Sequence, residues 1–146
     1  MTSKEIVSKL PYQYPFLFVD EILSVDENAI IGTYYYDEKL PFYEGHFKNN
    51  PITPGVILTE TMAQIGLVSL GIYMMTAKND AVLEDDIKIA LTSSAIDFFK
   101  PVFPGETVTV KSEKEYFRFN KLKCKVQMFN EKEELVCRGT IAGMMK

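Results

Sequence analysis

Residues 56–75 read Val-Ile-Leu-Thr-Glu-Thr-Met-Ala-Gln-Ile-Gly-Leu-Val-Ser-Leu-Gly-Ile-Tyr-Met-Met, an apolar run of twenty residues. That length would span a membrane. The run contains Glu60, however, and a carboxylate inside a span costs about 2.5–3.5 kcal/mol even on a lenient insertion scale. A pattern that is apolar on every side is also typical of a helix buried by protein. We therefore predict a buried core helix and no membrane span.

The residues around this run predict where the helix begins and ends. Thr53 suits the N-cap, and Pro54 suits the first helical position, where its missing N–H costs nothing. Gly71 and then residues 78–80 predict a break or an end of the helix. The acidic residues 84–86 predict a solvated connection.

The rest of the chain reads mostly as strands. Residues 2–5 form a capping-box pattern, which predicts a short helix to about Leu10. Residues 121–128 alternate lysine or glutamine with apolar side chains, so one face of that strand is buried and the other is wet. One long helix with five or six antiparallel strands predicts an α+β fold, in which the sheet curls around the helix. The predicted strands cover residues 16–25, 29–36, 87–100, 107–119, 121–128 and 135–144.

Composition narrows the class of protein. A chain of 146 residues is most simply one domain, residues 1–146, and its net charge of −4 argues against general nucleic-acid binding. No basic region followed by an apolar region opens the sequence, so we expect a cytoplasmic protein. Cys124 and Cys137 are too few and too far apart for a metal site, and each lies in an apolar strand, so we expect reduced core thiols and no metal.

The loop before the long helix carries His46, the one histidine in the sequence. A histidine in a loop can be merely structural, but its side chain titrates near neutrality. Pro54-Gly55-Val56 follows, and a helix N-terminus offers unpaired N–H groups and a partial positive charge that favour an oxyanion. Gly55 adds no side chain that would block a ligand oxygen. The alternative interpretation is that this proline and glycine only mark the start of the helix.

Glu60 shares a helix face with Val56, and Gln64 continues that face. A desolvated carboxyl has a raised pKa, which makes it a competent general acid near neutrality. The alternative is an exposed glutamate that the helix dipole stabilises. Together with His46, Glu60 supplies the parts of an acid–base site.

Basic side chains follow one face of a predicted strand at Lys121, Lys123 and Lys125. A solvated sheet face is the favoured interpretation of this row. The sharper hypothesis is a docking patch for an acidic carrier, since attraction to a partner must offset the negative net charge. Aromatic residues such as Phe98 and Phe99 are expected in the core or at a subunit interface.

Several of these motifs together resemble a known family. Gly45-His46-Phe47, Pro54-Gly55-Val56 and Glu60 with Ala63-Gln64 resemble the hotdog-fold (3R)-hydroxyacyl-[acyl-carrier-protein] dehydratases of fatty-acid synthesis. The likeness extends along nearly the whole chain in the right order. It includes Leu10-Pro11, the stretch Tyr14-Pro15-Phe16-Leu17, Val19-Asp20, and a Lys-Pro-Val-Phe-Pro-Gly turn that ends at Gly105.

The resemblance implies a curved antiparallel sheet around one helix and an active site built across a dimer. His46 would remove the C2 proton of a 3-hydroxyacyl thioester, and Glu60 of the other subunit would protonate or orient the departing hydroxyl. The Gly55 N–H, helped by Val56, would hold the thioester oxygen, with Gln64 in the same substrate-binding group. The product would be a trans-2-enoyl thioester on the acyl carrier protein, with no cofactor. A homodimer, a trimer of dimers or a heterodimer with a homologous subunit would be the assembly.

Three positions depart from the family pattern. Tyr12-Gln13 stand where the family has His-Arg, Lys48-Asn49-Asn50 replace Pro-Gly-x, and no tyrosine occurs around Lys88-Ile89-Ala90. None of these removes a proposed catalytic group. They raise the hypothesis of a specialised pathway, such as polyene or polyketide-like lipid assembly. Two alternatives stay open: a hotdog acyl thioesterase, and a non-catalytic hotdog subunit of a heterodimeric dehydratase.

Overall fold

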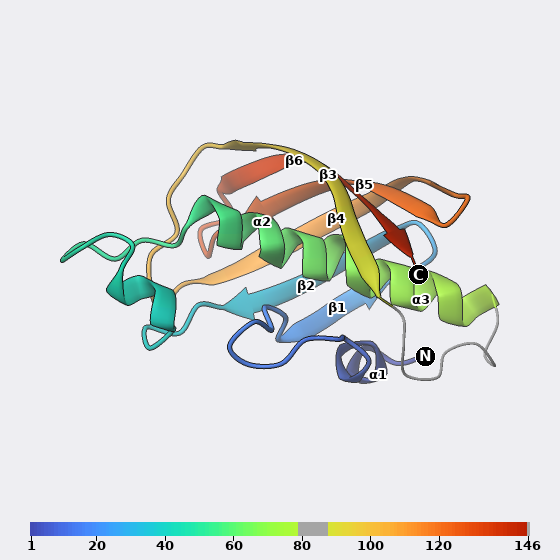
Figure 1. The fold of residues 1–146 in the computed structure, drawn as a ribbon, viewed down its shortest axis with the longest axis horizontal. Coiled ribbons are helices and arrows are strands. Elements are labelled where there is room, and N and C mark those ends of the chain that lie inside the picture. Colours follow the sequence, from blue (N-terminus) through green and yellow to red (C-terminus); the bar gives the residue numbers. More distant parts are fainter. Residues whose placement is uncertain (79–87, 146) are drawn as a thin grey trace.

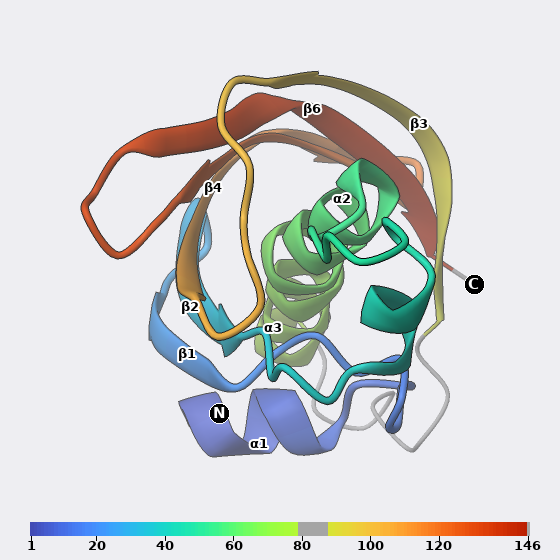
Figure 2. The ribbon, with the colours of Figure 1, turned by 90° about the vertical axis from the view of Figure 1, so that its left-hand side faces the viewer.

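The computed structural model describes residues 1–78 and 88–145, and within them the predicted α+β architecture is confirmed (Figure 1). Six strands form one antiparallel sheet in the order β1-β2-β4-β5-β6-β3. The sheet curls around one long helix, which Figure 2 shows nearly end-on. The predicted connection at residues 84–86, and residues 79–80 of the predicted helix end, lie outside the described residues. The strands are β1 (Glu21–Val25), β2 (Ala29–Tyr35), β3 (Ile89–Phe98), β4 (Thr107–Arg118), β5 (Lys121–Phe129) and β6 (Leu135–Met145).

The long helix has three consecutive parts, α2 (Gly55–Ala63), the π-helical turn η2 (Gln64–Ser69) and α3 (Leu70–Lys78). Every residue of η2 is buried, and this turn packs on β2, β4 and β5. By length and composition the helix Gly55–Ala77 could cross a membrane, but 72% of its most apolar window is buried inside the protein. The helix is therefore the core of the fold, as predicted.

The helix continues through Gly71, where the sequence predicted a possible break. A Cβ at Gly71 would lie 2.5 Å from Ile89 Cδ1 and 2.6 Å from Met145 Cε. Glycine at this position therefore allows the strands to approach the helix closely, and it does not end the helix.

The start of the helix differs from the prediction by one residue. Pro54 is the N-cap and Gly55 is the first helical residue, with no side chain capping the turn. Thr53 does not cap because its hydroxyl is 2.6 Å from the hydroxyl of Tyr43 in the core. The helix N-terminus is thus left without a side-chain acceptor.

The N-terminal region begins with α1 (Ser3–Ser8), where Thr2 and Glu5 form both bonds of the predicted capping box. The first strand begins at Glu21 and not near residue 16 as predicted. The reason is a side chain, since the backbone N–H of Phe18 and the carbonyl of Phe16 bond to Gln64. These backbone groups are therefore satisfied outside the sheet.

Strands β4 and β5 form a hairpin whose inner face is apolar, and Leu122, Cys124, Val126 and Met128 are buried as predicted. Cys124 and Cys137 are free and buried thiols, as expected, and burial raises their pKa to about 11 and about 12. The hairpin tip is unusual because Phe119 has a φ of 53° and is 92% exposed.

Strand β3 lies at one edge of the sheet. Among the described strands it pairs with β6 alone, from Ile89 opposite Met145 to Phe98 opposite Cys137. Most of its side chains are exposed on both faces, including Leu91 and Phe98. This edge is an open template for a further strand.

Candidate functional site

The His46 side chain is fixed by Ile52 across its own loop. The loop follows the 3-10 helix η1 (Pro41–Glu44), and the Ile52 N–H donates to the His46 carbonyl at 2.9 Å. In return, His46 Nδ1 lies 3.0 Å from the Ile52 carbonyl oxygen. A carbonyl only accepts, so Nδ1 carries the hydrogen, and in the neutral ring Nε2 is left as the free base. The ring also stacks on Phe47 at 4.1 Å between centroids.

His46 lines an open hollow of about 340 Å³ at one end of the helix. Three parts of the chain form it: the His46 loop, the start of α2, and the segment that follows β3. Two exposed aromatic rings, Phe98 and Phe99, form one wall, with exposed fractions of 49% and 52%. The other lining residues are Phe47, Ile52, Thr53, Gly55, Leu58, Lys100 and Pro101.

The N-terminus of α2 opens at this hollow through Gly55. The first helical hydrogen bonds come from the Ile57 and Leu58 N–H groups, both to the Pro54 carbonyl. Within the described residues, no acceptor is found for the N–H groups of Gly55 and Val56. A Cβ added at Gly55 would lie 3.3 Å from Phe98 Cζ, so the bare glycine keeps this corner open.

Glu60 lies farther along α2 in a half-buried setting. Burial raises its pKa above the usual value, while a hydrogen bond from Gln64 opposes that rise. The bond runs from Gln64 Nε2 to Glu60 Oε2 at 3.0 Å. Burial, and then the charge of Glu60, raise the pKa of Tyr12 to about 12. The predicted desolvated carboxyl is therefore present.

The predicted site residues fall into two groups within one chain. His46 and Gly55 lie together at the hollow, whereas Glu60 and Gln64 are joined by a hydrogen bond farther along the helix. Among the described residues, those that line the hollow do not include Glu60 or Gln64. Val56, at the helix start, is 77% exposed and points away from the core.

A known family matches almost the whole chain. The family model described as a FabA-like domain matches residues 10–142 of the sequence. The chain belongs to the FabA-like domain family. The matched residues include the His46 loop, the helix Gly55–Lys78, strands β1 to β5 and most of β6.

Curated relatives of this FabA-like chain carry dehydratase names. A 3-hydroxyacyl-[acyl-carrier-protein] dehydratase FabZ from Wolbachia sp. subsp. Brugia malayi is 30% identical over 146 residues, which is 97% of this chain and 94% of the relative. The FabZ of Chlamydia trachomatis is 38% identical over 112 residues, which is 75% of this chain and 70% of the relative.

Solved structures agree on the fold. A chain of the dehydratase heterocomplex ApeI:P from Xenorhabdus doucetiae superposes with a TM-score of 0.76, covering 100% of this chain and 92% of that one at 11% identity. A hypothetical thioesterase from Streptococcus pneumoniae gives a TM-score of 0.63 and 14% identity, with 86% of this chain and 84% of that chain covered. At these identities the likeness shows the hotdog fold alone.

The three lysines of this FabA-like chain lie on the outer face of β5, away from the helix. Glu115 is 3.7 Å from Lys123 Nζ and 3.9 Å from Lys125 Nζ. Lys121 pairs with Met144 at the end of β6, whereas Phe98 pairs with Cys137 at its beginning. Lys121 therefore lies at the end of the sheet opposite the His46 hollow of the same chain, and Lys125 lies nearer the middle.

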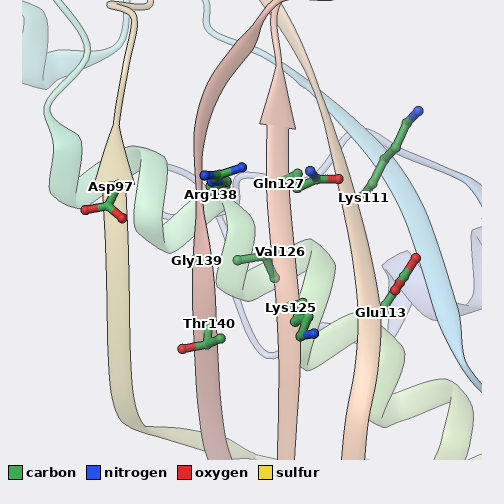
Figure 3. A pocket seen from close by; sticks show the side chains of 9 residues that line it. All are labelled: Asp97, Lys111, Glu113, Lys125, Val126, Gln127, Arg138, Gly139 and Thr140. Carbon is green, nitrogen blue, oxygen red and sulfur yellow. The ribbon is translucent and has the colours of Figure 1, made fainter.

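Figure 3 shows a second hollow, of about 470 Å³, on this outer face. Strand register aligns Asp97, Arg138, Gln127 and Lys111 in one row, with Thr140, Lys125 and Glu113 in the next. The hollow has three cations and two carboxylates. Of the three predicted docking lysines, only Lys125 lines it.

Sequence reasoning missed two contributors to the site. Ile52 orients His46 through its backbone, which no side-chain pattern reveals. Phe98 walls the hollow opposite Gly55, and the sequence marked it only as an aromatic of the core or an interface. Tyr12 departs from the family pattern, and the effect of the Glu60 charge on its pKa follows from the fold.

Proposed function

We propose that this chain is a 3-hydroxyacyl-[acyl-carrier-protein] dehydratase of fatty-acid biosynthesis, which converts the (3R)-hydroxyacyl thioester to the trans-2-enoyl thioester. The observation that carries the proposal is His46, held with Nε2 free at a hollow into which the unpaired N-terminus of α2 opens. The chain belongs to the FabA-like family, and FabZ relatives cover most of its length. A specialised pathway is not needed to account for these matches.

The reaction assigns one role to each group at the site. His46 Nε2 takes the C2 proton, and the electron pair of that C–H bond forms the C2–C3 double bond. The Gly55 N–H, with that of Val56, holds the thioester oxygen while negative charge develops on it. Glu60 gives a proton to the C3 hydroxyl, which leaves as water. Transfer of a proton from His46 back to Glu60, through solvent, restores both groups.

We propose that Glu60 acts on the hollow of a second copy of the chain. His46 and Glu60 lie in separate groups within one protomer, and β3 leaves an edge open next to the exposed Phe98 and Phe99. A twofold dimer pairs identical β3 strands antiparallel and covers these apolar side chains. The homodimer is the simplest assembly; assembly into hexamers, or pairing with a homologous subunit, would leave this two-chain site in place.

The same antiparallel pairing supports carrier docking at the lysines. It brings the Ile89 end of one β3 beside the Phe98 end of its partner. Lys121 lies at the Ile89 end of its own sheet, so it faces the end at which the partner's hollow opens. Lys121, Lys123 and Lys125 would then attract an acidic acyl carrier protein toward that opening. A cytoplasmic location completes the proposal and agrees with the free thiols.

The product of the reaction tests the function. Purified protein incubated with a 3-hydroxyacyl carrier substrate should produce a conjugated enoyl thioester, with loss of one water and no free thiol. Release of free carrier thiol would identify a thioesterase and contradict the proposal. Activity that requires an added homologous subunit would contradict the homodimer but not the chemistry.

A further inference from the structure

We propose that Gln64 is the positioning residue of the site: it holds one oxygen of Glu60 and ties it to the backbone of residues 16–18, leaving the other oxygen for the substrate. This inference rests on the proposed function, in which Glu60 is the general acid. It gives Gln64 a different role from the substrate contact that the family resemblance implies.

Every hydrogen-bonding group of the Gln64 side chain has a partner, and two of these partners are backbone groups. Oε1 accepts from the Phe18 N–H at 2.8 Å, and Nε2 donates to the Phe16 carbonyl at 2.9 Å. These partners fix which end of the amide is oxygen, since an N–H only donates and a carbonyl only accepts. The second Nε2 hydrogen goes to Glu60 Oε2 at 3.0 Å. No amide hydrogen remains for a substrate, and the side chain is 0% exposed.

The main chain at Gln64 is held as firmly as its side chain. Gln64 begins the π-helical turn η2, and its carbonyl accepts from the Ser69 hydroxyl at 2.7 Å. Two residues farther on, the Ser112 hydroxyl of β4 donates to the Gly66 carbonyl at 2.9 Å. Side chains thus bond carbonyls in the widened turn, where the regular α-helical ladder is interrupted. Of these two bonds, only the one from Ser69 restrains Gln64 itself; the Ser112 bond acts on Gly66, and its loss leaves the Gln64 carbonyl and amide paired.

Glu60 receives this bond on one oxygen. Gln64 is one helical turn farther on, so the two side chains share a face of the helix. The bond at Oε2 restrains the orientation of the carboxyl and, among the described residues, Oε1 has no hydrogen-bond partner. A general acid must be held within hydrogen-bond reach of its target, and a misplacement of about 1 Å can cost about 100-fold in rate. Gln64 supplies that restraint without contacting the substrate.

The bond also sets the pH range over which Glu60 is protonated. Burial raises the pKa of Glu60, and the Gln64 N–H lowers it by stabilising the carboxylate. Among the described residues, Tyr12, from the segment before β1, is a titratable group whose pKa the charge of Glu60 raises, and a pKa of about 12 keeps it neutral. Loss of the Gln64 donor should therefore raise the pKa of Glu60. The protonated acid then persists to higher pH, and the alkaline limb of the kcat profile moves upward.

The test compares Gln64→Met with Ser112→Ala in the full-length protein. Met fills a similar volume but removes the amide, whereas Ser112→Ala removes a buried hydrogen bond from the same turn without touching Glu60. The pKa of Glu60 is followed by NMR titration of carbon-13 carboxyl labels, beside the kcat–pH profile. We expect Gln64→Met to raise the pKa and to lower kcat about 10- to 100-fold. Ser112→Ala should change neither.

A second variant keeps the test decisive if Gln64→Met does not fold. Gln64→Glu retains an acceptor for the Phe18 N–H and places a second carboxyl beside Glu60, which should raise the apparent pKa values of the pair. An unchanged Glu60 titration in the folded variants would overturn the positioning role. The NMR measurement does not require activity, so a chain that proved not to be a dehydratase would leave this result interpretable.

Discussion

His46 Nδ1 lies 3.0 Å from the carbonyl oxygen of Ile52, and the Ile52 N–H returns a bond to the His46 carbonyl. The Ile52 carbonyl therefore fixes the tautomer of the ring and, with the stacked Phe47, its orientation. An outer partner of this kind commonly fixes which imidazole nitrogen is free. The nitrogen that remains, Nε2, is the proposed base.

His46→Ala should abolish dehydration and leave the fold intact. General acid–base groups contribute about 10²–10⁴-fold, so kcat should fall by that range. Glu44→Ala is the matched control, since Glu44 is an exposed neighbour in the preceding 3-10 helix and does not line the hollow. Circular dichroism with steady-state assays checks both variants. Turnover within threefold of the native rate in His46→Ala would eliminate His46 as the base.

Glu60→Gln should be nearly as damaging as His46→Ala, because the amide cannot donate the acidic proton. A mixed dimer of the two single variants contains one site with both native groups. Its activity should recover toward half that of the native dimer, measured after co-expression with two different affinity tags. Mixed dimers as inactive as either parent would place both groups in one chain.

Gly55→Ala should reduce turnover more than it changes stability. The added Cβ lies 3.3 Å from Phe98 Cζ, so the ring must move by a few tenths of an ångström at the mouth of the hollow. Alanine loses less conformational freedom on folding than glycine, which offsets the crowding by about 0.4–1 kcal/mol. We expect kcat/KM to fall while thermal unfolding is little changed.

Phe98→Leu provides the control for that steric effect. The double variant Gly55→Ala with Phe98→Leu should regain part of the lost activity, because the smaller side chain gives the methyl group room. The same loss in both backgrounds would show that crowding against Phe98 is not the cause.

Charge reversal at the lysine row should weaken only carrier-linked substrates. For Lys121→Glu and Lys125→Glu, measured separately, KM should rise with the carrier protein and stay constant with a small thioester analogue. Salt should reduce the difference, since exposed charges are screened. Lys132→Glu, at the exposed turn between β5 and β6, serves as the control for net charge. An equal loss with the small analogue would argue against docking at this row.

Phe119→Asn should stabilise the protein. Phe119 and Asn120 have φ values of 53° and 60°, a conformation that costs an ordinary residue about 1–2 kcal/mol and that asparagine tolerates. The exposed phenyl ring contributes little burial in return. Thermal or urea unfolding should show a gain of about 1 kcal/mol over the native chain. Phe119→Leu keeps the steric penalty and should show no gain.

The fold could be predicted from sequence because local patterns and burial agree. The apolar run at residues 56–75 requires a cover, and alternating strands such as β5 supply it. The start of β1 was placed too early because the bonds of Phe16 and Phe18 go to Gln64, 46 to 48 residues away in the sequence. Helix capping was misplaced for a similar reason, since Tyr43 takes the Thr53 hydroxyl. Such long-range competitors leave no local signal.

The sequence predicts which residues form the candidate site, but not which of them lie together in one chain. His46, Gly55 and Glu60 are close in sequence, and their chemistry is legible from residue type. In the described residues Glu60 does not line the hollow, and the whole Gln64 amide is bonded to other partners. Both facts depend on where the chain folds back, which the motif alone does not encode.

Strand β3 ties the proposed catalysis to solubility. An unpaired edge strand with exposed apolar side chains can pair with a strand of another molecule, and such edges promote aggregation. The dimer proposed for the active site would also remove this hazard. Substitutions along β3 that weaken this pairing should therefore cause the protein to aggregate before a loss of turnover can be measured.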